Sequence, residues 1–130
     1  MIPQALILYI ETEIIPRYEQ FDKAHNLSHV QAVIEESLAL AKLYPEADER
    51  LAYTIAAYHD TGLCRDRATH HLVSGEIIAE DANLLQWFGK EEIEIMRLMG
   101  VSNWYIKTPL IMQGAFYGFV SSVIAVLPLN

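Results

Sequence analysis

Residues 51–60 read Leu-Ala-Tyr-Thr-Ile-Ala-Ala-Tyr-His-Asp. The first eight of them are apolar except Thr54, so we expect a helix that neighbouring elements surround on most sides. The pair His59-Asp60 closes the run, and burying an unpaired imidazole or carboxylate costs free energy. A bound metal ion offsets that cost, so the pair predicts a metal site. The alternative for such a pair is a satisfied core histidine followed by a turn aspartate.

The helical spacing of apolar residues continues on both sides of this run and predicts an all-α fold. Asp48 can cap the central helix, and Gly62 marks its end. Ser28 and Gln31 fit a capping box at the start of the preceding helix. The expected helices span about residues 3–16, 28–45, 48–62, 70–88 and 91–99.

The overall composition indicates a single globular domain. The chain has 130 residues, of which 52% are hydrophobic and 20% are charged. Its net charge of −8 disfavours nucleic acids and anionic membranes as partners recognised by bulk electrostatics. Cys64 is the single cysteine, so no internal disulfide can form, and the first residues lack the basic flank of a secretory signal. We therefore expect a cytoplasmic protein.

The last part of the chain differs in character, because residues 109–128 contain no charged side chain. Such a stretch is a candidate membrane span, although its length is marginal for a bilayer. Three small residues within it fall on one helical face, where they would let helices approach closely. Membrane insertion, homodimer contact and packing into the core all stay open for this segment. We divide the chain into a helical domain, residues 1–97, and an apolar helical tail, residues 98–130.

Three segments of the helical domain match a known pattern in their order and spacing. They are residues 21–30 (FDKAHNLSHV), 56–63 (AAYHDTGL) and 70–75 (HHLVSG). With these segments the chain resembles the HD-domain family of metal-dependent phosphohydrolases over residues 14–96. The resemblance implies an HD-domain-like helical bundle, here truncated, that holds a metal ion and hydrolyses a small phosphorylated metabolite or nucleotide.

By this resemblance His29, His59 and Asp60 are metal ligands, and imidazole and carboxylate groups suit a divalent ion. The sequence does not choose among zinc, manganese, iron, cobalt, nickel and magnesium. The family's fourth ligand is an aspartate on a later helix, whereas this chain has no aspartate after Asp81. Three ligands and water can still form a catalytic site, but a site built for four would hold its ion more weakly.

Further polar residues follow the pair. The resemblance implies that His70 and His71, together with Asp60, take part in catalysis by contacting a second metal ion or the phosphate. The alternative for the two histidines is an exposed helix start. Arg65 and Arg67 could bind phosphate through paired hydrogen bonds, and the alternative for each is a solvated loop charge.

A second resemblance begins where the first one ends. Residues 92–107 (EIEIMRLMGVSNWYIK) are similar to the bacterial cell-division permease family, and the similarity extends over residues 91–126. In that family a short amphipathic helix leads here into a membrane span. Two unrelated pieces would then join near Met96. A natural fusion, a sequence error and a constructed chimera would each produce such a join.

Two functions follow from these patterns. The first is an HD-type phosphohydrolase, impaired to the extent that the missing fourth ligand weakens metal binding. The alternative is a non-catalytic helical domain with a degraded metal site, whose tail mediates dimerisation or attaches the protein to a membrane through residues 109–128.

Overall fold

The computed structural model describes residues 1–23 and 25–101, and this part of the chain folds into helices without strands. Its elements are α1 (Gln4–Tyr9), η1 (Ile10–Ile14), η2 (Ile15–Gln20), α2 (Leu27–Ala41), α3 (Glu49–Tyr58), η3 (Thr61–Cys64), α4 (His70–Glu80), η4 (Ala82–Gln86) and α5 (Lys90–Val101). Segment η1 is a π-helical turn, and η2, η3 and η4 are 3-10 turns. The all-α prediction is confirmed for these residues. None of the described helices is long and apolar enough to cross a membrane, and the candidate span at residues 109–128 lies outside the described part.

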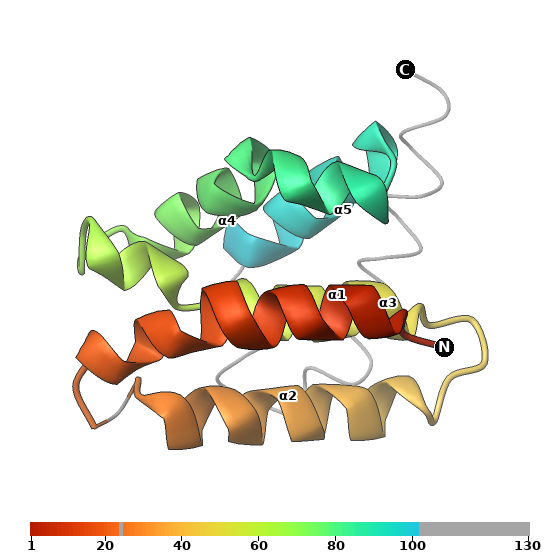
Figure 1. Cartoon of the computed structure of the whole chain (residues 1–130), viewed down its shortest axis with the longest axis horizontal. Helices are drawn as coiled ribbons and strands as arrows, with labels where there is room; N and C mark the ends of the chain where they lie inside the picture. The colour runs from red at the N-terminus through yellow and green to blue at the C-terminus, as the bar shows by residue number, and fades with distance from the viewer. Residues whose placement is uncertain (24, 102–130) are drawn as a thin grey trace.

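Helix α3 lies in the middle of the bundle (Figure 1). Helix α2 packs along one side of it, while α4 and α5 pack against each other on the other side. All eight residues from Leu51 to Tyr58 are buried, as the apolar run predicts. The core that these residues share includes Leu6, Ile10, Ile14, Ile78, Leu84, Met96 and Met99. Because His59 and Asp60 follow α3 directly, the helix carries both into the interior, where each is less than 5% exposed.

The start of α2 differs from the prediction. Asn26 has an extended backbone, and its Oδ1 accepts a hydrogen bond from the backbone amide of His29 at 3.3 Å. This bond satisfies one of the amides that the first turn leaves without a helical partner, so the helix begins at Leu27 and the predicted capping box at Ser28 is wrong. His29 nevertheless lies in the first turn of α2, as expected.

Gly62 has a role other than the predicted one of ending the central helix. Helix α3 ends at Tyr58, and none of the described glycines has a positive φ. Gly62 lies inside η3, where an added Cβ would be 2.1 Å from the carbonyl oxygen of His70. Its amide also donates a hydrogen bond to Oγ of Ser74 at 2.8 Å. A glycine is needed here because η3 touches the backbone of the first turn of α4.

The helix expected over residues 70–88 is broken into two segments. Helix α4 ends at Glu80, and Asp81 adopts an extended backbone. The Asp81 carboxylate then caps η4 by accepting a hydrogen bond from the amide of Asn83 at 3.0 Å. The break follows from this side chain, because an aspartate that satisfies the amides of a new helical start competes with continuation of the old helix.

Candidate metal centre

Three predicted ligands converge at the C-terminal end of α3. Nε2 of His29 lies 3.2 Å from Nε2 of His59 and 3.3 Å from Oδ2 of Asp60. Nε2 of His59 lies 2.9 Å from the same carboxylate oxygen. Among the described residues, these three form a group whose atoms could together hold a metal ion.

The local backbone explains how two consecutive residues reach one point. Successive side chains of an α-helix point about 100° apart, which separates them on a regular helix. His59 keeps helical angles as the C-cap of α3, whereas Asp60 leaves the helix with φ −111° and ψ 9°. The first turn of the antiparallel neighbour α2 brings His29 to the same place. The pair can therefore share one ion because it lies at the helix terminus.

The triangle of ligand atoms has the size that a single ion requires. Atoms bound about 2.1 Å from one ion lie about 3.0 Å apart at right angles and about 3.4 Å apart in a tetrahedral arrangement. Two of the three observed separations, 3.2 and 3.3 Å, lie within this range, and the third, 2.9 Å, lies just below it. The His29 side chain is 33% exposed, so the group is open to solvent on that side. Two histidines and one carboxylate with open positions suit a divalent transition metal.

The His59 ring is held in the state that a metal ligand needs. Its Nδ1 lies 2.6 Å from the carbonyl oxygen of Ala56, and a carbonyl only accepts, so Nδ1 carries the proton. In the neutral ring Nε2 then presents a lone pair toward the oxygen of Asp60, which presents another. A second proton on the ring or a shared cation is needed to make this contact favourable. The arrangement of a ring N–H on a carbonyl behind a ligand nitrogen is typical of metal sites.

The surroundings of the centre favour an ionised Asp60 and a neutral His29. Burial raises the pKa of Asp60, but the hydrogen bond and the electrostatic attraction that the His59 ring supplies when it carries its second proton outweigh it and hold that pKa below its ordinary value. Burial, followed by repulsion from His59, lowers the pKa of His29. A carboxylate that stays ionised and an imidazole that stays neutral are the forms that bind a cation.

His70 approaches the second oxygen of the same carboxylate. Its Nε2 lies 3.2 Å from Oδ1 of Asp60, and its Nδ1 lies 3.0 Å from the carbonyl oxygen of Arg67. The rings of His70 and His59 are therefore oriented alike: in each, Nδ1 lies next to a backbone carbonyl and Nε2 lies next to the Asp60 carboxylate. His71 lies beside it, with ring centroids 3.8 Å apart. The structure thus brings one of the two predicted catalytic histidines into direct contact with Asp60.

The two predicted phosphate ligands take different places. Arg67 lies 2.5 Å from Oδ2 of Asp22, and the other oxygen of that carboxylate lies 2.8 Å from Nδ1 of His25. The His25 ring in turn packs edge-on against His29, with centroids 5.8 Å apart, so Arg67 is linked to the border of the metal centre. Arg65 instead points toward Glu80, at 3.5 Å, and lines a cavity that contains none of the three predicted metal ligands.

One supporting residue was not identified from the sequence. Tyr18 is fully buried, and its hydroxyl donates to the carbonyl oxygen of Ala57 at 2.7 Å and accepts from the amide of Asp60 at 3.2 Å. It therefore fixes the turn that aims the carboxylate. The only signal in the sequence was its spacing of four residues from Ile14, which predicts burial but not this contact.

Asp81, the last aspartate of the chain, does not supply the missing fourth ligand. Its Oδ2 accepts hydrogen bonds from the hydroxyls of Tyr9 and Tyr58, both at 2.6 Å, and it is outside the three-residue group. The described residues thus place His70, rather than a fourth carboxylate, on the free side of Asp60.

Comparisons with known proteins concern the C-terminal part of the chain. A family model described as FtsX-like permease C-terminal matches residues 89–129. The cell division protein FtsX of Bacillus anthracis is 46% identical over 35 residues, which cover 27% of this chain and 12% of that protein. The cell division protein FtsX of Bacillus subtilis (strain 168) is 43% identical over 37 residues, which cover 28% of this chain and 12% of that protein. No solved structure matches.

These findings support the second resemblance and not the first. The chain is similar to a short C-terminal part of a permease and spans about 12% of the length of these curated relatives. The comparisons give no support to the HD-domain resemblance, which stays a prediction. The match begins at residue 89, and α5, which lies within it, buries Ile95, Met96 and Met99 in the core of the bundle. The boundary after residue 97 also stays a prediction.

Proposed function

We propose that the helical domain is a divalent-metal-dependent phosphohydrolase of the HD type, acting on a small phosphorylated metabolite or nucleotide. The observation that carries the proposal is the convergence of His29, His59 and Asp60 within 3.3 Å of one another. The order of the three sequence segments that resemble the HD-domain family supports the same assignment.

The charge of the ligand set favours an anionic substrate. Two neutral imidazoles and one carboxylate contribute a charge of about −1, which leaves a divalent ion with a net positive charge. An ion bound there would polarise a phosphoryl oxygen and lower the pKa of a bound water. His70, which lies against Asp60, and His71, which lies against His70, would contact the phosphate or move a proton. Arg67 is joined to His25 through Asp22 at the border of the site, and it would bind the substrate phosphate by exchanging this carboxylate for it.

Turnover and metal content measured together test the proposal. The full chain is assayed against phosphate monoesters and nucleotides with manganese, cobalt, zinc and magnesium, and its metal content is determined by elemental analysis. We expect His59→Ala and Asp60→Asn to lose both metal and turnover, while Glu91→Gln, which removes an exposed carboxylate on α5, keeps both. Unchanged turnover and unchanged metal content in the first two variants would show that the proposal is wrong.

A second candidate function is a non-catalytic domain that is attached to a membrane or dimerises through its tail. The observation that favours it is the match of residues 89–129 to a permease segment. In this case the domain would keep a degraded metal site without turnover, because the fourth ligand of the family is missing. The two candidates differ in whether metal at full occupancy is accompanied by hydrolysis.

Flotation with lipid vesicles tests this second candidate. The full chain is mixed with zwitterionic vesicles, because its net charge of −8 opposes binding to anionic ones. Comigration with vesicles that resists high salt supports membrane attachment. Purification without detergent as a single monodisperse monomer would exclude both a membrane span and a stable dimer.

A further inference from the structure

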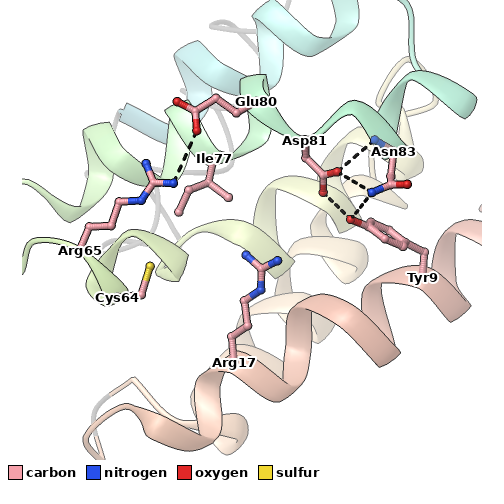
Figure 2. Close-up of a pocket in the computed structure, with 8 residues that line it drawn as sticks. All are labelled: Tyr9, Arg17, Cys64, Arg65, Ile77, Glu80, Asp81 and Asn83. Atoms are coloured by element: carbon pink, nitrogen blue, oxygen red, sulfur yellow. Dashed lines mark hydrogen bonds and ion pairs between the residues drawn. The ribbon is translucent and has the colours of Figure 1, made fainter.

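The structure contains a cavity of about 300 Å³ that is separate from the metal centre (Figure 2). Its walls come from α1, η2, α4, η4 and the turn at the end of η3, and none of its lining residues belongs to the group His29, His59 and Asp60. Arg17 and Arg65 lie among the lining residues. The volume is at the lower end for ligand pockets and suits a small metabolite.

At one end of the cavity the polar side chains are already hydrogen-bonded to one another. Oδ2 of Asp81 accepts from the hydroxyls of Tyr9 and Tyr58, and Oδ1 accepts from the backbone and side-chain amides of Asn83 at 3.0 and 3.1 Å. The Asn83 side chain also donates to the Tyr9 hydroxyl oxygen at 3.2 Å. Both carboxylate oxygens of Asp81 are therefore used, and this end offers little attraction to a cationic ligand.

The two arginines of the cavity have guanidinium N–H groups that are available to a ligand. Nε of Arg17 donates to the backbone carbonyl of Glu13 at 3.1 Å, and the described residues give its guanidinium no carboxylate partner. Figure 2 shows this guanidinium pointing into the cavity. Arg65 lies 3.5 Å from Glu80, and both side chains of that pair are more than half exposed. An exposed pair of this kind contributes about 0–1 kcal/mol, so a ligand could replace the glutamate at small cost.

Arginines elsewhere in the described part of the chain are paired more closely. Arg50 reaches the carboxylates of Asp48 and Glu92 at 2.7 Å each, and Arg67 reaches Asp22 at 2.5 Å. In a chain of net charge −8, carboxylates are abundant, yet the two cavity arginines lack such close partners. This contrast indicates that their guanidinium groups are available to an external anion.

We propose that this cavity binds a small molecule through its carboxylate or phosphate group, which Arg17 and Arg65 hold together. A guanidinium presents paired N–H donors whose geometry matches either oxyanion. Ile77 provides an apolar surface for the rest of the ligand, and Tyr9 and Asn83 form a rigid polar wall. The site is independent of the metal centre and of the phosphohydrolase proposal.

Cys64 provides a direct reporter of occupancy. It lines the cavity, is exposed, and is the only cysteine of the chain, so modification of the protein by iodoacetamide reports on this position alone. The alkylation rate of the full chain is followed by mass spectrometry with inorganic phosphate, with acetate, and with chloride at equal ionic strength. Metal is first removed by dialysis against a chelator, which is then dialysed away, so that phosphate cannot act through the metal centre.

We expect saturating phosphate or acetate to slow alkylation at least fivefold relative to chloride, and Arg17→Gln and Arg65→Gln each to abolish this protection. Arg67→Gln, which removes the same charge from the same loop outside the cavity, should keep it. Protection by phosphate alone assigns a phosphate-bearing ligand, and protection by acetate assigns a carboxylate. The proposal is overturned if neither anion protects, or if protection survives in both cavity variants while circular dichroism shows them folded.

Discussion

Asp60 follows the end of α3 and Asp81 follows the end of α4, and each carboxylate lies among ring side chains. The partners of Asp60 are three histidine rings, contributed by His29, His59 and His70, at 2.9 to 3.3 Å. The main partners of Asp81 are the hydroxyls of Tyr9 and Tyr58 at 2.6 Å. Burial raises the pKa of both carboxyls, but the opposing interactions outweigh it, so both pKa values lie below the ordinary range: at Asp81 they are hydrogen bonds from the two phenols, and at Asp60 they come from His59 when its ring carries a second proton.

The difference between the two sites lies in their protons. Each phenol of the Asp81 site carries its own proton and donates it, so the carboxylate is satisfied without any added ion. At Asp60, two of the rings use their Nδ1 proton on the carbonyls of Ala56 and Arg67, and their Nε2 atoms face the carboxylate. Such a site requires extra protons or a cation. Of these two buried carboxylates, Asp60 is therefore the metal-site candidate, because its neighbours present lone pairs rather than protons.

The largest expected effect comes from removing a ligand ring. His59→Ala should lower metal affinity by about 100-fold or more, since even partners behind the ligands are worth about 10- to 100-fold. Competition with a metal-binding dye measures the dissociation constant of each variant. Asp81→Asn is the matched change at the other carboxylate and should leave the affinity within about twofold. Equal losses in the two variants would mean that the two sites do not differ in the proposed way.

Metal binding should also stabilise the fold. A ligand at a free concentration of 100 times its dissociation constant raises the free energy of unfolding by about 2.7 kcal/mol. For a chain of this size the melting temperature should rise by roughly 10 °C. Thermal unfolding with and without manganese or zinc tests this in the parent chain and in Asp60→Asn. A rise of the same size in Asp60→Asn would place the binding elsewhere.

Gly62 offers a way to disturb Asp60 without changing a ligand. A Cβ at this position would lie 2.1 Å from the carbonyl oxygen of His70, so Gly62→Ala must push η3 away from the first turn of α4. We expect a loss of about 1–3 kcal/mol in stability, together with weaker metal binding. Gly89→Ala is the control, because an added Cβ there meets nothing within 4 Å. Chemical denaturation of both variants measures the difference, and equal stabilities would contradict the close approach.

Much of this arrangement could be predicted from the sequence. The apolar run before His59 predicts a buried helix, and this is confirmed. The His-Asp pair suggests a metal site, which the order of the three resembling segments favoured over a satisfied core histidine, and the structure brings together three side chains that could hold an ion. The α2 start was misplaced because Asn26 and Ser28 are both good caps, and only the loop conformation decides between them. The break at Asp81 was missed because an aspartate in a helical pattern can also lie on an exposed face; here hydroxyl groups from α1 and α3 hold the carboxylate where it caps η4.

The roles of two further residues could not be predicted from the local sequence pattern. Tyr18 reads as one more apolar position, and its hydroxyl contact with the Asp60 amide depends on packing between segments 42 residues apart. Arg65 follows the metal pair closely in sequence, which suggested a phosphate ligand at the metal centre. The 3-10 turn η3 instead carries it to a different cavity, beside Glu80.

Asp81→Asn should have the smallest effect on stability. Its dependence on pH tests whether the Asp81 carboxylate is satisfied by its hydrogen-bond donors alone. Because the folded pKa of Asp81 lies below its ordinary value of 3.8, the ionised carboxylate stabilises the fold above that value, and this contribution disappears as the pH falls through the folded pKa. Burial, followed by the hydrogen bond to Asp81, raises the pKa of both Tyr9 and Tyr58, so both phenols remain protonated donors near neutral pH.

We expect the Asp81→Asn variant to be about 1–2 kcal/mol less stable at pH 7. The difference from the parent chain should narrow as the pH falls below 3.8, measured by denaturant unfolding at each pH. A gap that widens toward acid would contradict the lowered pKa of Asp81.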